Sequence, residues 1–361
     1  MTGSTLSGAW PEYLAILLVS ALLCTLLTPV AIKVAIRIRV FDHPAGHKSH
    51  ESPVPYLGGV AIVLAFAAAV LLGAIADRPE SGVGELAKIL GLAVALAAIG
   101  LLDDLRNLSP VIRLAAEVAA GLAVWQMGTG VLITGVTGVD VALTVLWVVG
   151  ITNAFNLLDN MDGLAAGMAG IASLTFFSIA SANGQFLVAA LSIGLVGCSA
   201  GFLRLNVHPA RVYMGDGGSL FLGFMVAYLG LKLRFLTSVS ESFLVPVLAC
   251  APAILDTTLV SVSRLTSGRS PFQGGRDHVS HRLVAVGLPV PVAVGVMHLF
   301  AVAVGVICFV VSRVDQASAW TLAALVFGFI GGAGVLLYLV PVYPESARPH
   351  FVISERSTEV D

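Results

Sequence analysis

Acidic, amide and imidazole side chains are concentrated in four short segments, and each segment adjoins a long apolar run. Polar groups at membrane depth are costly, so they usually mark a working site. Carboxylates can hold a divalent cation, while Arg and His donors suit phosphate oxygens. The combination predicts a metal–diphosphate site built from residues 101–104, 153–163, 214–219 and 276–282.

Asp103 and Asp104 end the third apolar run. Paired carboxylates at such a boundary can bind Mg²⁺, or one can act as a base while the other tunes it. The alternative is a solvated helix end, although the helix dipole opposes Asp at a C-terminus. We therefore expect the pair to be functional.

Four polar residues recur every third position at the end of the fifth apolar run: Asn153, Asn156, Asp159 and Asp162. At this spacing they would lie near one face of a helix, as a polar stripe. The alternative is hydrogen bonding between helices inside the membrane. Gly163 would then let the chain turn before the next helix.

Residues 214–219 surround Asp216 with glycines and open the eighth run. Glycine lets backbone approach a ligand closely, and the helix N-terminus that follows favours an anion such as a diphosphate. Asp216, with Asn156, would hold Mg²⁺ (or Mn²⁺) against phosphate oxygens. Tyr213 could stack on a base, although a tyrosine at the membrane interface is as common an explanation.

Basic and imidazole residues fill two further loops. The longer loop could donate to phosphate oxygens or contact anionic lipid headgroups. Its residues are Arg276, His278, His281 and Arg282. Lys48 and His50, in the first loop, have the same two explanations. Zinc is disfavoured because no cysteine accompanies the histidines. Asp256 is expected to be buried and paired, with no role assigned by spacing.

The elements that position these residues are membrane helices. Of 361 residues, 57% are hydrophobic and 11% charged, whereas soluble domains carry about 25% charged residues. This composition predicts an all-α polytopic membrane protein, and a net charge of −2 argues against a nucleic-acid partner. The four cysteines lie in apolar runs and are expected to be core residues rather than disulfide or zinc ligands.

We expect about eleven spans (10–11) in one membrane domain, residues 1–343, followed by a polar, disordered tail, residues 344–361. Residues 131–139 are predicted to form a short external hairpin. The expected spans are 13–36, 57–76, 85–102, 110–127, 141–156, 164–182, 186–203, 218–236, 242–263, 289–312 and 319–342.

Positive charge sets the predicted orientation. Most loop Lys and Arg residues fall in one set of alternating loops and the tail. The other set holds Arg78, Lys232, Arg234 and Arg313. The first set is therefore expected in the cytoplasm, with the N-terminus outside and the C-terminus inside. All the polar segments lie on that cytoplasmic side of the cell membrane, in loops and at helix ends.

At this point the chain resembles the polyprenyl-phosphate N-acetylhexosamine-1-phosphate transferases (glycosyltransferase family 4). The resemblance rests on residues 53–59, 103–104, 153–163, 214–219 and 270–283, in this order. It implies transfer of a sugar-1-phosphate, most readily GlcNAc-1-phosphate, from a UDP-amino-sugar to undecaprenyl or decaprenyl phosphate. The products would be UMP and a polyprenyl-diphosphate-linked sugar, the first membrane step of a cell-envelope glycan. It also suggests a homodimer.

The resemblance implies roles for individual residues. Asp103, with Asp104 beside it, would act on the lipid phosphate, and Asp216 would bind Mg²⁺. Asn156, Asp159 and Asp162 would line the nucleotide-sugar and metal site, and Tyr213 would stack on uracil. His278 and His281, with Arg276 and Arg282, would lie near the diphosphate. An Asp could instead attack first and form a covalent intermediate.

One position departs from the family. Its common bacterial loop carries His-x-His-His before Arg-Leu, and Ser280 replaces the middle histidine here. Relatives specific for the muramyl-pentapeptide carry three consecutive histidines, so the departure favours the GlcNAc-1-phosphate branch. Two other interpretations are an ion-coupled transporter, which should carry relay residues at mid-membrane depth, and an inactive relative that serves as an assembly partner.

Overall fold

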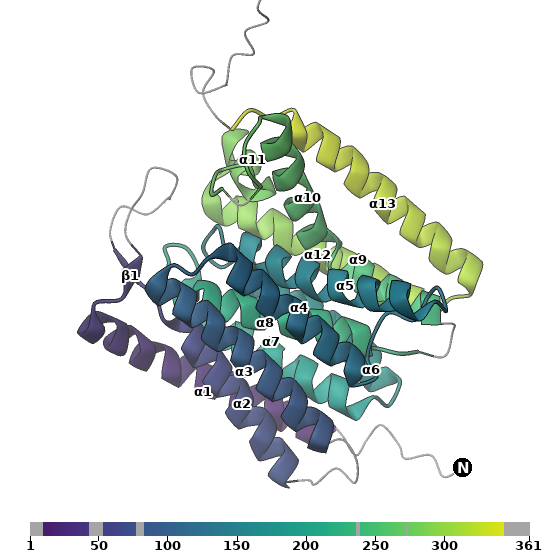
Figure 1. Ribbon diagram of the computed structural model, residues 1–361, viewed down its shortest axis with the longest axis horizontal. Helices are drawn as coiled ribbons and strands as arrows, with labels where there is room; N and C mark the ends of the chain where they lie inside the picture. Colours follow the sequence, from purple (N-terminus) through teal and green to yellow (C-terminus); the bar gives the residue numbers. More distant parts are fainter. Residues whose placement is uncertain (1–9, 43–52, 77–82, 236–238, 272, 343–361) are drawn as a thin grey trace, which may run out of the picture.

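The structure, a computed structural model, describes residues 10–42, 53–76, 83–235, 239–271 and 273–342. Within these residues the chain is almost entirely helical (Figure 1). The helices are α1 (Trp10–Ile38), α2 (Gly58–Ala76), α3 (Val83–Arg106), α4 (Pro110–Gln126), α5 (Thr137–Leu158), α6 (Leu164–Ala182), α7 (Phe186–Asn206), α8 (Gly215–Lys232), α9 (Val239–Ala249), α10 (Ala251–Thr266), α11 (Val279–Ala285), α12 (Val290–Val311) and α13 (Gln316–Tyr338). Lys48, His50 and the predicted tail lie outside the described residues.

The chain is a multi-pass membrane protein. Among the described residues, eight helices are long and apolar enough to cross a membrane, or nine if the bent pair α9–α10 is one span. Every predicted span overlaps a helix or this bent pair. Helix α4, which matches the predicted span 110–127, has 17 residues. The polytopic all-α prediction is confirmed, and the count of eleven stays a prediction.

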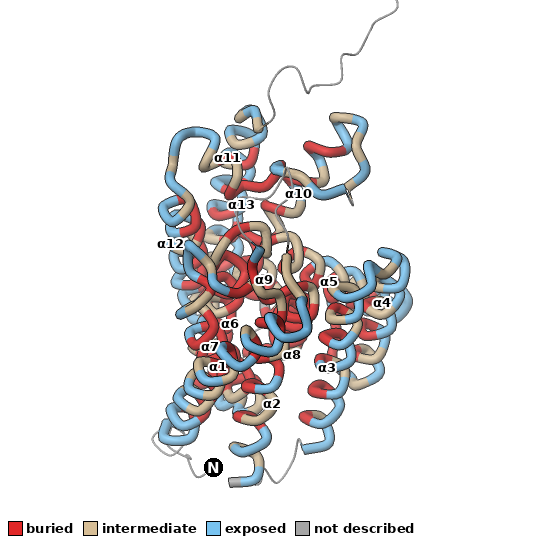
Figure 2. The backbone as a smooth tube through the Cα atoms, turned by 90° about the vertical axis from the view of Figure 1, so that its left-hand side faces the viewer, coloured by how far each residue is buried: buried red, intermediate tan, exposed pale blue. Residues whose placement is uncertain are grey.

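Helix α8 is the centre of the bundle. It is buried along nearly its whole length and packs against α3 and α5, while α7 packs against α1 and α6. Buried residues gather on these inner helices, and the outer faces of α1, α12 and α13 are exposed (Figure 2). Leu14, Leu18, Leu22 and Leu26 of α1 are exposed at four-residue spacing, as expected for a lipid-facing stripe.

The span predicted at 242–263 is broken. Helices α9 and α10 meet at Cys250 with a bend of 60°. Pro246 and Pro252 flank the break, and proline removes a backbone donor and clashes with the preceding turn. Because of the bend, α10 approaches α5 and α13, at the margin of the bundle (Figure 1).

The predicted hairpin at 131–139 is wrong. Residues 131–136 form no strand, and α5 already begins at Thr137. The reason is a local cap: the Asp140 carboxylate accepts hydrogen bonds from the Thr134 backbone N–H at 3.0 Å and the Thr134 hydroxyl at 2.9 Å. These bonds commit the segment to a turn that leads into the helix.

A short two-stranded ladder ties the first loop to the start of α8. Strand β1 (Phe41–Asp42) pairs antiparallel with β2 (Val54–Pro55). Next to this ladder, the Tyr213 backbone N–H donates to the Pro55 carbonyl at 2.9 Å, and the Gly58 N–H donates to the Tyr213 carbonyl at 2.9 Å. The two motifs therefore lie side by side. The four cysteines are buried and free, as expected.

Candidate active site

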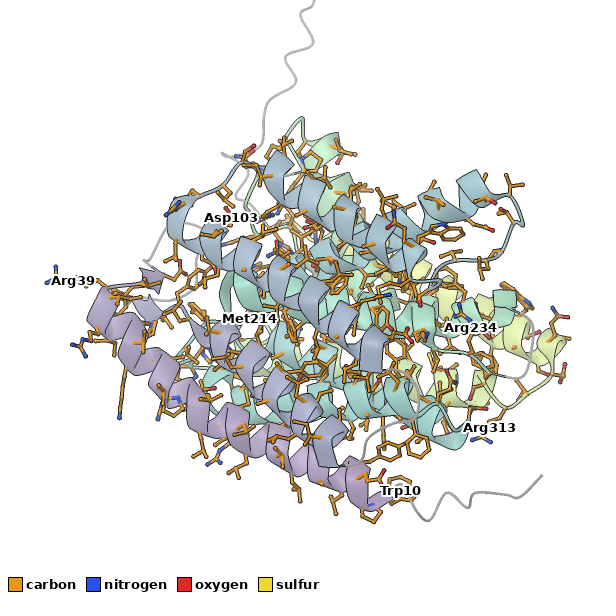
Figure 3. All side chains as sticks on the ribbon, turned by 60° about the horizontal axis from the view of Figure 1, so that its bottom comes forward. Trp10, Arg39, Asp103, Met214, Arg234 and Arg313 are labelled. Carbon is orange, nitrogen blue, oxygen red and sulfur yellow. The ribbon has the colours of Figure 1, made fainter. Side chains whose placement is uncertain are left out.

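A cavity of about 730 Å³ lies at one end of the bundle. Figure 3 shows Asp103, Met214 and Arg39 towards this end, and Trp10, Arg234 and Arg313 towards the other. The cavity is lined from α3, α4, α5 and α10, and from the loops before α6, α8 and α11. The site residues predicted from the sequence that line this cavity are Asp103, Asn153, Asn156, Asp159, Asp162, Tyr213, Asp216, His278 and His281.

Asp103 and Asp216 are joined by an arginine that spacing did not single out. Nη1 of Arg113, on α4, lies 2.8 Å from Oδ2 of Asp103 and 2.5 Å from Oδ2 of Asp216. The other oxygen of Asp103 accepts the Leu108 N–H at 2.6 Å. One cationic nitrogen therefore bridges carboxylates from α3 and α8.

Asp104 caps α8. Its carboxylate accepts the backbone N–H groups of Asp216 at 2.9 Å and Gly217 at 3.2 Å, and it also accepts a hydrogen bond from Tyr56. Gly215 lies at φ 71°, where a Cβ would meet this carboxylate. Here the anion at the helix N-terminus is Asp104 rather than a diphosphate, and Asp104 does not line the cavity. Its contacts give it a positioning role.

The amides of the predicted polar stripe hold the site together. The Asn156 amide group donates to Oδ1 of Asp216 at 2.8 Å and to the Ser219 hydroxyl at 2.9 Å. The Asn153 amide group donates to Glu117 and, at 2.9 Å, to the Val149 carbonyl. Both amide nitrogens are therefore committed, and the carboxamide oxygens are the acceptors left for a ligand.

Helix α5 ends at Leu158, so Asp159 and Asp162 of the predicted stripe line the cavity from the loop that follows. Asp162 accepts from the Ala210 N–H at 3.0 Å and contacts His208 at 2.7 Å, which fixes the loop before α8. Burial and the nearby carboxylates of Asp216 and Asp104 raise the pKa of Asp159 to about 8. The left-handed Gly163, at φ 76°, makes the predicted turn into α6.

Tyr213 lines the cavity beside this loop. Burial and the carboxylates of Asp162 and Asp42 raise the pKa of Tyr213 above its usual range, so the phenol stays neutral. Stacking of its ring on a base stays a prediction.

The two predicted histidines line the opposite wall. Nδ1 of His278 lies 2.8 Å from Oδ2 of Asp256, on α10. In the tautomer in which Nδ1 donates to this carboxylate, Nε2 is the ring nitrogen that can contact a ligand. The two rings lie 6.0 Å apart. Burial, with the neighbouring His278 and Arg276, lowers the pKa of His281 to about 4, so His281 is neutral near pH 7.

The two predicted arginines do not line the cavity. Arg276 is exposed. Arg282 is buried: Nη1 donates to the carbonyls of Leu337, Tyr338 and Val340 at 3.0, 3.1 and 2.7 Å, at the C-terminal end of α13. Arg282 therefore anchors the histidine loop to the last helix, and its contacts are structural.

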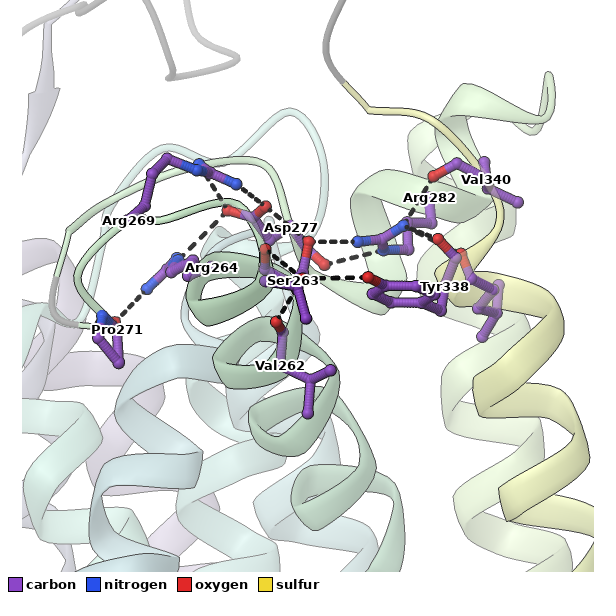
Figure 4. Close-up of polar contacts among 11 residues, drawn as sticks. Val262, Ser263, Arg264, Arg269, Pro271, Asp277, Arg282, Tyr338 and Val340 are labelled. Atoms are coloured by element: carbon purple, nitrogen blue, oxygen red, sulfur yellow. Dashed lines mark hydrogen bonds and ion pairs between the residues drawn. The ribbon is translucent and has the colours of Figure 1, made fainter. Parts of the chain in front are cut away.

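The same network fixes the loop from the other side. Buried Asp277 accepts from Arg264 at 3.2 Å, from Arg269 at 2.5 Å and from Ser263 at 3.1 Å. Figure 4 shows Arg264 and Arg269 on one side of Asp277 and Arg282 on the other. This charge is buried but paired, as buried charges must be.

Ser280, the position that departs from the family, is fully buried. Its hydroxyl donates to Oδ1 of Asn160 at 2.6 Å, which joins the histidine loop to the loop that carries Asp159. The serine thus connects two motifs without lining the cavity itself.

A divalent cation fits the donor chemistry of the cavity. Carboxylates from three segments face the cavity, at Asp103, Asp159 and Asp216, with Arg113 as the cation among them. Among the described residues, no group of three or more His, Cys, Asp or Glu side chains could hold a metal alone. Mg²⁺ is usually held by one or two carboxylates, water and substrate phosphates, so this set suits it.

Sequence patterns missed Arg113, Glu117, Tyr56 and the role of Asp256. Arg113 and Glu117 stand four residues apart in the fourth apolar run, which was the available signal. Tyr56 lay inside a quoted motif without an assigned role. For Asp256 the spacing gave no signal, because its partner is 22 residues away on another element.

The fold and the cavity define a polytopic membrane protein with an acidic, histidine-walled site at one end. The model of glycosyl transferase family 4 matches residues 86–234. A probable undecaprenyl-phosphate N-acetylglucosaminyl 1-phosphate transferase of Bacillus subtilis (strain 168) is 30% identical over 343 residues, 92% of this chain and 93% of the relative. The chain belongs to glycosyl transferase family 4, which confirms the resemblance.

Two further relatives cover less of the chain. A decaprenyl-phosphate N-acetylglucosaminephosphotransferase of Mycolicibacterium smegmatis is 31% identical over 76% of this chain and 75% of its own length. A phospho-N-acetylmuramoyl-pentapeptide-transferase of Heliobacterium modesticaldum is 38% identical over 54% of this chain and 64% of its own.

Proposed function

We propose that this protein transfers a sugar-1-phosphate, GlcNAc-1-phosphate first of all, from a UDP-sugar to polyprenyl phosphate and releases UMP. The observation that carries the proposal is that Asp103, Asp216 and His278, from three distant segments, line one cavity. Transfer of this kind depends mainly on positioning and charge neutralisation. Full-length relatives whose names state this reaction support the assignment.

The cavity residues divide into two groups. On the acidic wall, Asp103 would orient the lipid phosphate or take its proton. On the opposite wall, His278, held by Asp256, would donate to a diphosphate oxygen. Tyr213 would contact the base. Asp159 and the carboxamide oxygens of Asn153 and Asn156 would complete the donor site.

We propose Mg²⁺, with Mn²⁺ as a substitute, as the cofactor. Asp216 would hold it, together with the carboxamide oxygen of Asn156. When bound, the ion would supply neutralisation of the diphosphate charge. The support is the excess of carboxylates around the cavity.

We further propose that the cavity opens to the cytoplasm, with eleven spans and the N-terminus outside. Its support is the distribution of positive charge: most loop Lys and Arg residues belong to the loops that carry the motifs and to the tail, whereas the other set of loops holds Arg78, Lys232, Arg234 and Arg313. Figure 3 shows Arg39 towards the cavity end, and Arg234 and Arg313 towards the other end. Positive loops stay in the cytoplasm. The homodimer suggested by the resemblance stays a prediction.

The branches of the family differ in the UDP-sugar that they use as donor. Ser280 in place of a histidine favours GlcNAc-1-phosphate, while the muramyl-pentapeptide donor is the alternative, since one relative carries that name. Family membership favours a transferase over an ion-coupled transporter.

The test is UMP release by purified protein with undecaprenyl phosphate, Mg²⁺ and, in turn, UDP-GlcNAc, UDP-GalNAc and UDP-MurNAc-pentapeptide. Release should require both the lipid phosphate and Mg²⁺, with UDP-GlcNAc preferred. Asp103→Asn and Asp216→Asn should each abolish turnover in folded protein. Wild-type turnover in either variant, or no release with any donor, contradicts the assignment.

A further inference from the structure

Arg113 occupies the position between two carboxylates that a bound cation would take. One nitrogen, Nη1, contacts Oδ2 of Asp103 at 2.8 Å and Oδ2 of Asp216 at 2.5 Å. The remaining oxygen of Asp216 accepts from Asn156. Both oxygens of Asp216 therefore accept from protein donors. A cation could bind Oδ2 of this carboxylate only if the Arg113 guanidinium moved away from it.

A second position for the guanidinium is already present on the same helix. Glu117 follows Arg113 by four residues, the spacing at which side chains on a helix meet. Glu117 is 1% exposed, and its Oε1 is buried without a hydrogen-bond partner among the described residues. Nε of Arg113 is likewise buried and unpaired within the part of the chain that the structure describes.

Such a pair is unusual, because a buried polar atom without a partner is destabilising. A carboxylate oxygen and a guanidinium nitrogen that both lack partners, one helical turn apart, can satisfy each other after a rotamer change of Arg113. The change would free Oδ2 of Asp103 and Oδ2 of Asp216 together.

We propose that Arg113 is an internal counter-cation with two positions. Without a divalent cation it bridges Asp103 and Asp216. When the cation binds Asp216, Arg113 moves to Glu117, and the same movement frees Asp103 to face the lipid phosphate. Arg113 and Glu117 are thus positioning residues that couple cation binding to exposure of Asp103. The inference rests on the proposed function for the identity of the cation.

The test measures Mn²⁺ binding to substrate-free protein in detergent, from the electron paramagnetic resonance signal of free Mn²⁺. Arg113→Gln should bind Mn²⁺ at least roughly tenfold more tightly than the wild type, because a competing positive charge is gone. Glu117→Gln should weaken binding several-fold, because the displaced guanidinium loses its acceptor. Both variants should lose UMP release.

Arg106→Gln is the matched control. It removes the same charge from an exposed position at the end of α3, and its Mn²⁺ affinity should stay at the wild-type value. Asp216→Asn should abolish tight binding in the Arg113→Gln background. Arg113→Met serves as a second variant if the first does not fold, as judged by thermal unfolding.

Unchanged or weaker Mn²⁺ binding in folded Arg113→Gln and Arg113→Met overturns the proposal, and so does equal tightening in Arg106→Gln. If Arg113 only supported the fold, its substitution would change the unfolding temperature without increasing the affinity for Mn²⁺. The readout needs no sugar donor or lipid, so the proposed reaction can fail while the exchange is observed, and the reverse.

Discussion

Asp256 holds both the His278 ring and the backbone at the start of α11. Oδ2 of Asp256 lies 2.8 Å from Nδ1 of His278, and Oδ1 accepts the Val279 N–H at 2.7 Å. The carboxylate is fully buried and the ring is 4% exposed. The side chain and the start of α11 are thereby fixed by one residue of α10, so the direction of Nε2 depends on where the bend at Cys250 sends that helix.

Asp256→Asn should lower kcat by roughly 100-fold. The Asn side chain can still accept from the Val279 N–H, but its other end becomes a donor facing Nδ1 and forces the opposite tautomer. Turnover and its pH dependence, measured by UMP release, check this. Asp140→Asn is the control, since Asp140 is buried in the first turn of α5, far from the cavity. Equal losses in both variants would refute an orienting role.

Arg282→Gln should lower the unfolding temperature by roughly 5 °C, because three carbonyls at the C-terminal end of α13 lose their donor. The KM for the sugar donor should change less than about twofold, since Arg282 does not line the cavity. Arg276→Gln, on the exposed side of the same loop, should change stability little. A large rise in KM with unchanged stability in Arg282→Gln would instead indicate that Arg282 contacts a phosphate, as the sequence predicted.

Ser280→His should restore the family's histidine pattern without improving the enzyme. Ser280 is fully buried against Asn160, so a larger ring would strain the loop and destabilise it by about 1–3 kcal/mol. UMP release should fall with UDP-GlcNAc and should not appear with UDP-MurNAc-pentapeptide. Ser280→Ala, which removes the hydrogen bond alone, should lose activity only several-fold. New activity with the pentapeptide donor would show that this position selects the donor.

The raised pKa of Asp159 should make the stability of the cation-free protein depend on pH. Burial and neighbouring carboxylates raise its pKa to about 8 in the folded chain, against about 3.9 when unfolded. Between these values the folded state binds a proton that the unfolded state does not, so stability falls as pH rises through this window. With a chelator present, the unfolding temperature should fall from about pH 4 to about pH 8 and level off above, and Asp159→Asn should flatten the decline. An equal decline in the variant would contradict the shift.

The sequence predicted which segments meet, because each polar segment ends an apolar run on the same side of the bundle. Asp103, Asn156, Asp216 and His278 line one cavity for that reason. The outlines of the helices followed from hydropathy. Their caps and bends did not, as the hairpin expected at 131–139 shows.

Side-chain partners could not be predicted from spacing. Asp104 and Asp216 are 112 residues apart in the chain, and which of two adjacent carboxylates caps α8 depends on the rotation of α3 against α8. Arg113 lies in the fourth apolar run, where spacing assigns it no carboxylate outside its own helix, yet it bridges two carboxylates from other helices. Hydropathy places a helix in the membrane but leaves its rotation about its own axis undetermined.

The anchor of Arg282 has a consequence for biosynthesis. Three of its acceptors, the carbonyls of residues 337, 338 and 340, follow every acidic motif in the chain, so they leave the ribosome after all of these motifs. A nascent chain arrested before them would contain all the motifs, but Nη1 of this buried guanidinium would lack its acceptors. The Asp277 carbonyl and the Ser263 hydroxyl would still accept from Nε and Nη2. We therefore expect the loop that carries His278 and His281 to be fully anchored only after α13 has been inserted.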